Sequence, residues 1–216
     1  MSSYPITDKN KVRRVAKRGH YDRETVYEVL DAAKHCHLGF NVDGQPFVIP
    51  TLFGREGDKL YVHGAVQSRM LVHLEKSPQA CLTVTHIDGL VLARSAFHHS
   101  MNYRSAVVFG KLTKLEGEEE KNHALKVISD HLLPGRWEEC REPSANELKA
   151  TTVLVMEIDQ ASAKIRTGGA VDAPADYKLP IWAGVLPYEF SLGAPIPDDQ
   201  LSPEIQLCES VKRCFQ

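Results

Sequence analysis

Residues 61–69 of the chain, Tyr-Val-His-Gly-Ala-Val-Gln-Ser-Arg, have the residue types and the order of a phosphate-binding loop. A run typical of a strand ends at His63 and Gly64, and helical apolar spacing begins after Ser68 and Arg69. The first turn of a helix leaves N–H groups without partners, so it attracts anions. A serine hydroxyl adds a donor and an arginine adds a bidentate cation. On residue types alone, the pattern also fits a helix-capping serine beside a solvated arginine.

Histidines are the second group of residues that could do chemistry. His98 and His99 lie between two predicted strands, and histidine titrates near neutral pH, so His98 and His63 are candidates for acid–base catalysis. Solvated side chains would give the same pattern. His35 and His37 share one face of a predicted strand, but no third ligand accompanies them, so we predict no metal site.

The elements that must position these residues follow from apolar periodicity and from turn residues. Asp43-Gly44 between two apolar runs predicts a hairpin, because this turn needs positive φ angles. Asp88-Gly89 predicts a second hairpin, and Gly110 predicts a bulge within a long strand. We expect helices over 22–34, 66–76 and 116–132, and strands over 36–42, 46–53, 59–63, 80–85, 90–97, 103–115, 148–158 and 163–166, the last two paired as a hairpin.

Six to eight short antiparallel strands with two or three helices predict a mainly β (β+α) fold, closed as a barrel with helices over its ends. The chain contains neither of the glycine-rich motifs of dinucleotide-binding and P-loop folds. We predict a basic N-terminal arm over 1–20, one domain over 21–190 and a C-terminal tail over 191–216. We expect the arm to be a mobile segment or a strap across a partner subunit. We expect the segment after Gly168 to wrap around the domain and not to form a second one.

Composition narrows the classes of partner. With 26 basic and 28 acidic residues the net charge is -2, so we expect no nucleic-acid and no membrane partner. No apolar run is long enough for a secretory segment or a membrane span, and a cytoplasmic location is expected. The five cysteines form no C-x-x-C pair, which disfavours disulfides and zinc, and Cys36 and Cys81 are expected to be small buried hydrophobes.

Three segments together resemble a known family. Residues 61–69, a following helix, Ser77-Pro78 and Ala80-Cys-Leu-Thr-Val84 are similar to the phosphate-binding strand, loop and helix of pyridoxamine 5'-phosphate oxidases and related FMN-binding split barrels. Residues 103–110 resemble the next flavin-contacting strand, which ends in a glycine, and Ile49-Pro-Thr51 resembles the strand along the isoalloxazine. The resemblance covers about residues 20 to 190. It implies an FMN-binding split β-barrel with flanking helices.

The resemblance also assigns roles to individual residues. Ser68 and Arg69 should hold the FMN phosphate, with His63 and Gly64 beside the ribityl chain and phosphate. Arg104 and Ser105 should approach the flavin from the second subunit. Trp182 is expected either to stack over the flavin or to plug the end of the barrel. The strand that passes the ring by backbone contact comprises Val48, Ile49, Pro50 and Thr51.

The chain departs from the oxidase pattern in two places. Met70 stands where these oxidases usually carry a second basic residue, a loss for which Arg55 or the basic arm could compensate. Residues 163–216 lack the strand rich in arginine and histidine that binds the substrate phosphate. The chain therefore resembles more closely the branch of flavin-nucleotide-binding and nitroimidazole-resistance proteins, to which residues 63–69 and the run Trp182-Ala-Gly-Val-Leu-Pro187 both point.

The function implied is that of an FMN-dependent oxidoreductase, with FAD as the alternative flavin. We expect a homodimer with the flavin at its interface, acting on a small-molecule substrate and reduced by NAD(P)H. Two alternatives stay open. The first is a non-catalytic flavin carrier or sensor, and the second is a haem-binding split barrel with His63 or His98 as the iron ligand.

Overall fold

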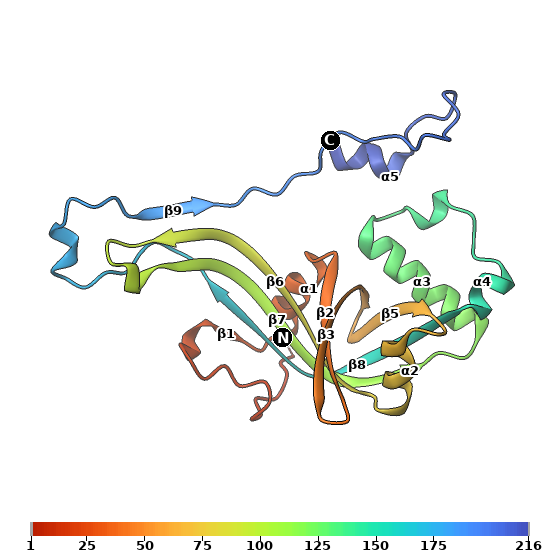
Figure 1. Cartoon of the computed structure of the whole chain (residues 1–216), viewed down its shortest axis with the longest axis horizontal. Coiled ribbons are helices and arrows are strands. Elements are labelled where there is room, and N and C mark those ends of the chain that lie inside the picture. The colour runs from red at the N-terminus through yellow and green to blue at the C-terminus, as the bar shows by residue number, and fades with distance from the viewer. Residues whose placement is uncertain (1, 216) are drawn as a thin grey trace.

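Long antiparallel strands dominate the computed structural model, which describes residues 2–215 (Figure 1). Within these residues one nine-stranded sheet has the order β3-β2-β6-β7-β8-β5-β4, with β1 paired to β8 and β9 paired to β6. The strands are β1 (Gly19–His20), β2 (His35–Val42), β3 (Gln45–Leu52), β4 (Gly54–Glu56), β5 (Lys59–Ala65), β6 (Gln79–Leu92), β7 (Ser100–Lys114), β8 (Thr151–Arg166) and β9 (Gly184–Pro187). The helices are α1 (Arg23–Asp31), α2 (Arg69–Lys76), α3 (Glu118–Leu132), α4 (Ala145–Lys149) and α5 (Glu209–Lys212).

The sheet curls so that β3 and β5 approach each other without pairing. The interior is filled by inward-facing residues of these strands, including Leu38, Leu82 and Val108, against which α1 and α2 pack. An antiparallel sheet that nearly closes and leaves one unpaired seam is a split barrel. The predicted fold class, mainly β with flanking helices, is confirmed.

Local turn and cap signals correctly predicted several elements. Asp43 and Gly44 have φ angles of 52° and 85°, and they join β2 to β3 with Val42 opposite Gln45. Helix α1 begins after Asp22, whose carboxylate accepts the N–H of Thr25 at 2.9 Å.

The predicted hairpin at Asp88-Gly89 is wrong. Strand β6 continues from Gln79 to Leu92 and shows only a register irregularity between Ile87 and Gly89. Gly89 is needed for close packing rather than for a turn, because a Cβ there would lie 2.9 Å from the carbonyl oxygen of Leu186 in β9.

The predicted hairpin between residues 148–158 and 163–166 is also wrong, because both runs belong to the single strand β8. Strand β7 pairs with β8 along almost its whole length, so the end of β8 hydrogen-bonds to β7 and not to its own beginning. The register shift expected at Gly110 is present, between Phe109 and Gly110. A Cβ at Gly110 would clash with the carbonyl oxygen of Glu157 and would lie 2.7 Å from Cγ of Met156, so only glycine allows the two strands to approach this closely.

The N-terminal arm packs on its own chain, which corrects the expectation of a mobile segment. Tyr4 is buried and its hydroxyl donates a hydrogen bond to Asp58. Asn10 is also buried, and its side-chain amide donates to the carbonyl of Ala161 at 3.0 Å. Polar groups that are buried this way need partners, and the arm finds them in the barrel.

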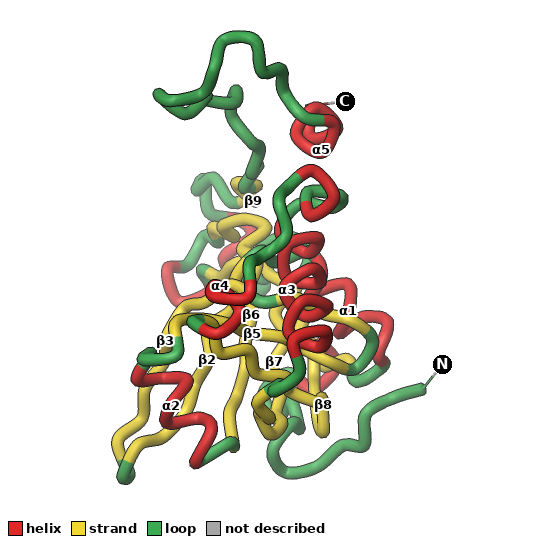
Figure 2. Tube along the Cα trace, turned by 90° about the vertical axis from the view of Figure 1, so that its right-hand side faces the viewer, coloured by secondary structure: helices red, strands yellow, loops and turns green. Residues whose placement is uncertain are grey.

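The C-terminal segment leaves the barrel after β9 and runs apart from it before α5 (Figure 2). All residues from 188 to 207 are exposed, and α5 then lies near the end of α3 (Figure 1). No helix within residues 2–215 combines the length and apolar character needed to cross a membrane.

Candidate functional site

The loop between β5 and α2 has the geometry of an anion site. Ser68 precedes the helix, and its hydroxyl makes no capping hydrogen bond. The N–H of Val72 donates to the carbonyl of Ser68 at 2.9 Å, so the helical ladder begins there and leaves the N–H groups of the first turn without helical partners. Gly64 allows α2 to approach β5, because a Cβ there would lie 3.0 Å from Cδ1 of Leu71.

Arg69 connects this loop to β3. Its guanidinium carbon lies 5.0 Å from the ring centroid of Phe47, a cation–π distance. Along β3, Phe47 and Ile49 pack against the core, whereas Val48 is 66% exposed and Pro50 is also exposed. The structure therefore brings the predicted β3 segment, the loop residues Gly64 and Ser68, and Arg69 to one end of the split between β3 and β5.

Arg69 is the cation that α2 offers at this loop, because Met70 points elsewhere. The Met70 side chain is only 7% exposed and belongs to the hydrophobic core. Arg55, considered as a compensating cation, instead donates to Asp31 at the end of α1, with 2.6 Å between Nε and Oδ1. Met70 thus serves packing, and Arg55 is held by a carboxylate.

His63 faces a pocket on the side of β5 opposite to Gly64. Alternate residues of a strand point to opposite faces, and a pocket of about 300 Å³ beside His63 is lined by Leu125 of α3, by Thr151 of β8 and by Arg141, Pro143 and Glu147. The Nδ1 atom of His63 is buried and has no hydrogen-bond partner within the described residues. Burial lowers the pKa of His63 below its ordinary value, so the imidazole is neutral at pH 7.

Arg141 and Glu147, which line the His63 pocket, were not predicted as site residues. The Arg141 guanidinium donates to both carboxylate oxygens of Glu147, at 2.8 Å each. This pair holds the pKa of Glu147 well below its usual range. Ser144 and Glu147 form a capping box that begins α4, and the order Ser-x-x-Glu in the sequence would have predicted this short helix.

Arg104 and Ser105 lie apart from the β5–α2 loop within one copy of the chain. They are near the beginning of β7, whereas the end of β7 packs against α2. Arg104 binds the Asp88 carboxylate, with 2.8 Å between Nη2 and Oδ1, and Ser105 donates to the carbonyl of Lys164 at 3.3 Å. Arg104 lines a cleft of about 650 Å³. That cleft is also lined by His35, His37, His86, Tyr188 and Phe190.

His98, His99 and Trp182 lie at the distal end of the β6–β7 hairpin, away from the loop. His98 closes a short 3-10 turn, and His99 accepts the N–H of Ala93 on Nδ1 at 3.0 Å. Trp182 is 63% exposed and precedes β9, which pairs with β6. A single chain does not bring these three side chains to Ser68 and Arg69.

Cysteines contribute nothing to this site. Cys36 is buried, as predicted, and burial raises the pKa of its thiol to about 12. Cys81, which was predicted to be buried as well, is only half-buried on β6. Within residues 2–215 no three side chains of histidine, cysteine, aspartate or glutamate are grouped as a metal site.

Residues 22–165 match the model of the pyridoxamine 5'-phosphate oxidase family. Among solved structures, the flavocytochrome Anf3 from Azotobacter vinelandii is 40% identical over 96% of both chains, with a TM-score of 0.90. The FAD and haem binding protein from Mycobacterium smegmatis is 34% identical over 91% of this chain and 97% of that chain, with a TM-score of 0.87.

A protein from Bacteroides thetaiotaomicron, described as a 5-nitroimidazole antibiotic resistance protein, is 27% identical over 68% of this chain and 86% of that chain, with a TM-score of 0.59. No curated protein sequence matches this chain. The family match covers the barrel from α1 to β8, with the β5–α2 loop inside it. The chain therefore belongs to the pyridoxamine 5'-phosphate oxidase family.

Proposed function

We propose that this protein is a redox protein that binds FAD at the β5–α2 loop and haem at His63. The observation that carries the proposal is the extent of its likeness to the flavocytochrome and to the FAD and haem binding protein. Those two structures align over 96% and 91% of the chain, whereas the family model ends at residue 165 and the nitroimidazole-resistance structure covers 68%. This pattern favours the haem-binding alternative over a flavin-only oxidoreductase.

The flavin phosphates would be held by the Ser68 hydroxyl, the free N–H groups of the first turn of α2 and the Arg69 guanidinium. A phosphate monoester such as that of FMN carries nearly two negative charges at pH 7. Each phosphate of the FAD diphosphate carries one. The total charge is therefore about the same for both flavins, and with Met70 in the core and Arg55 paired with Asp31, Arg69 is the cation that would meet it. The choice of FAD rests on the likeness to the FAD and haem binding protein.

His63 fits the requirements of an iron ligand in two respects, both of which follow from its burial. Its pocket contains a buried ring nitrogen, Nδ1, that no described residue satisfies. Its lowered pKa keeps the imidazole neutral, which leaves a lone pair for a metal. Arg141 lines the same pocket, and a haem carboxylate there would have to share this guanidinium with Glu147, to which it is already paired.

When bound, flavin supplies hydride and single-electron chemistry and haem supplies single-electron chemistry. The residues of this chain position both groups. Gly64 and His63 are consecutive in β5 and face opposite sides of it, so the two sites share one strand. This arrangement supports electron transfer between the groups, with NAD(P)H as the reductant and a small molecule as the final acceptor.

A homodimer would complete the flavin site. Arg104, Ser105 and Trp182 lie apart from the loop in one copy, so we assign them to the flavin held by the loop of a second copy. The exposed apolar side chains of Val48 and Leu52 on β3 support burial against that copy.

The test is an absorbance spectrum of the purified protein and of three variants, each titrated with FAD and with haemin. His63→Ala should lose the Soret band and keep the flavin. Arg69→Ala should keep the Soret band and bind FAD more weakly. His98→Ala, the matched histidine control, should keep both. A Soret band of unchanged position and intensity in His63→Ala would refute the ligand assignment.

Anaerobic addition of NADH or NADPH then separates a redox enzyme from a carrier. An enzyme should show bleaching of the flavin and a shift of the haem bands, both reversed by an added acceptor. Flavin that stays oxidised under both nucleotides would contradict the proposed reduction by NAD(P)H. Flavin that bleaches while the haem bands stay those of the oxidised form would contradict the proposed electron transfer.

A further inference from the structure

Residues 188–207, here called the tail arch, are joined to the rest of the chain at both ends and packed against little between them (Figures 1 and 2). Every residue of the arch is exposed, including large apolar side chains. Phe190 is 83% exposed and Ile196 is 93% exposed. Folded proteins rarely leave such a run uncovered unless a partner covers it.

The first attachment is β9, whose four residues pair with Gly89 to Leu92 of β6. The N–H of Tyr188 extends this pairing by donating to the carbonyl of Asp88 at 3.1 Å. Tyr188 and Phe190 then stack, with centroids 5.8 Å apart and planes at 17°, at the edge of the cleft that contains Arg104.

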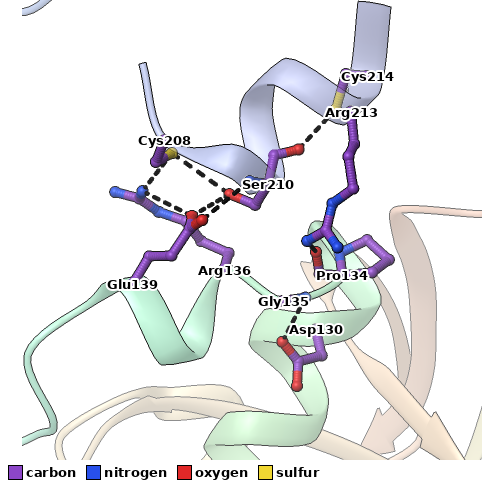
Figure 3. A network of polar contacts seen from close by, with 9 residues as sticks. All are labelled: Asp130, Pro134, Gly135, Arg136, Glu139, Cys208, Ser210, Arg213 and Cys214. Carbon is purple, nitrogen blue, oxygen red and sulfur yellow. Dashed lines mark hydrogen bonds and ion pairs between the residues drawn. The ribbon is translucent and has the colours of Figure 1, made fainter. Parts of the chain in front are cut away.

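The second attachment is a polar network around α5 (Figure 3). The N–H of Ser210 donates to Oε1 of Glu139 at 3.0 Å, and Ser210 is buried. The Arg136 guanidinium donates to Sγ of Cys208 at 3.0 Å, and Arg213 donates to the carbonyl of Pro134 at 3.1 Å. The arch is anchored at both ends, and its prolines at 195, 197 and 203 favour an extended backbone. It should therefore lose little conformational entropy when it binds a partner.

The charge of the arch indicates what it binds. Residues 188–207 contain four carboxylates and no lysine or arginine. Residues 9–18 of the N-terminal arm contain six lysines and arginines and no carboxylate, and most of these side chains are exposed. Both views place this arm at the opposite end of the molecule from the arch, so the two segments of one chain do not meet (Figures 1 and 2).

We propose that the tail arch is a clasp for a second copy of this chain, which it grips through the basic residues 9–18 of that copy. The apolar side chains of the arch would cover the partner's surface, and its carboxylates would pair with the partner's arm. A two-fold axis makes the contact occur twice and closes the assembly as a dimer. The inference rests on the homodimer proposed above and is independent of the cofactors that the dimer holds.

Charge reversal tests the clasp on the full-length protein. The arch variant carries Glu189→Lys, Asp199→Lys and Glu204→Lys, which change the charge of the arch from −4 to +2. The arm variant carries Lys9→Glu, Lys11→Glu, Arg14→Glu, Lys17→Glu and Arg18→Glu, which change the charge of residues 9–18 from +6 to −4. In each variant alone, arch and arm of two copies repel, and the dimer dissociation constant from sedimentation equilibrium should rise about tenfold or more. The effect should diminish in high salt, because exposed charges are screened.

An equimolar mixture of the two variants should recover the original dissociation constant, because each arch then meets an arm of opposite sign. A chain that carries both sets of reversals should also recover it. Recovery in the doubly reversed chain but not in the mixture would place the contact within one chain and overturn the proposal. Unchanged dissociation constants for both variants, or weakening without recovery in the mixture, would overturn it as well.

The control reverses three exposed acids of the barrel and its helices, with Glu28→Lys, Glu142→Lys and Asp159→Lys. It should leave the dissociation constant within about twofold. Circular dichroism and thermal melting check that all variants fold. Flavin and haem content is measured on the same samples, so a failure of the cofactor proposal, seen as missing bands, is distinguished from a failure of the clasp.

Discussion

Replacing Asp58 with alanine should destabilise the protein by about 2 to 4 kcal/mol, because this carboxylate ties the N-terminal arm and α1 to the barrel. The hydroxyls of Tyr4 and Tyr27 each donate to Oδ1 of Asp58 at 2.5 Å. The Arg23 guanidinium donates to Oδ2 at 2.9 Å. Donors from the N-terminal arm and from α1 therefore meet at one carboxylate, in the turn between β4 and β5.

The magnitude follows from how well each donor can reach water after the change. Tyr4 is only 2% exposed, so its hydroxyl would stay buried without a partner, at a cost of about 1 to 3 kcal/mol. Tyr27 and Arg23 are partly exposed and can be hydrated, so each should lose only about 0.5 kcal/mol. For a chain of this size the sum lowers Tm by roughly 4 to 16 °C.

The assay is thermal and urea unfolding of Asp58→Ala beside Asp159→Ala, which removes an exposed carboxylate from the same end of the barrel. The control should stay within about 0.5 kcal/mol of the original protein. A second comparison isolates the orphaned hydroxyl. Adding Tyr4→Phe to Asp58→Ala should be neutral or stabilising, whereas Tyr4→Phe alone should be destabilising.

The same contact has a pH signature. Burial raises the pKa of Asp58, but the hydrogen bonds from Tyr27, Tyr4 and Arg23 outweigh it and lower the pKa below 3.8. A carboxylate with a lowered folded-state pKa stabilises the protein above its unfolded pKa, and this contribution is lost as the pH falls through the folded value. The difference in stability between the original protein and Asp58→Ala should therefore be constant from about pH 5 to 7 and shrink below about pH 4. A loss under about 0.5 kcal/mol at pH 7, or a loss that does not change with acid, would refute the reasoning.

Further predictions concern the loop and the cysteines. Arg69→Ala should weaken flavin binding by about 1.5 to 3 kcal/mol, roughly 10- to 150-fold in Kd, whereas Lys76→Ala at the other end of α2 should leave it unchanged. Equal Kd values for the two variants in a flavin fluorescence titration would reject the phosphate assignment. Gly64→Val should lower both flavin affinity and Tm, because a Cβ there would lie 3.0 Å from the Leu71 side chain. Unchanged values of both would show that α2 need not approach β5 closely. Cys36 should resist iodoacetamide at pH 8 while the exposed cysteines react, because burial raises the pKa of its thiol to about 12. Equal labelling of all cysteines in the native protein, measured by peptide mass spectrometry, would contradict this.

Sequence alone predicted the features that depend on neighbouring residues. The hairpin at Asp43-Gly44, the cap of α1 at Asp22 and the strand, loop and helix around Ser68 all formed where their residue types predicted. Each depends on backbone conformation or hydrogen bonds within a few residues. The resemblance carried by such local segments was enough to predict the split barrel and the family.

Features that depend on strands far apart in the sequence were decided only by the tertiary structure. In the sequence, Gly89 could mark a turn or a place where two strands approach closely. The pairing of β9 with β6 shows that it marks a close approach. The pocket of His63 is completed by Arg141, and the N-terminal arm is held by the bond between Tyr4 and Asp58. These contacts join residues tens of positions apart, so no local pattern encodes them. They form because the curled sheet and its covering helices place those side chains together and bury them where each polar group must find a partner.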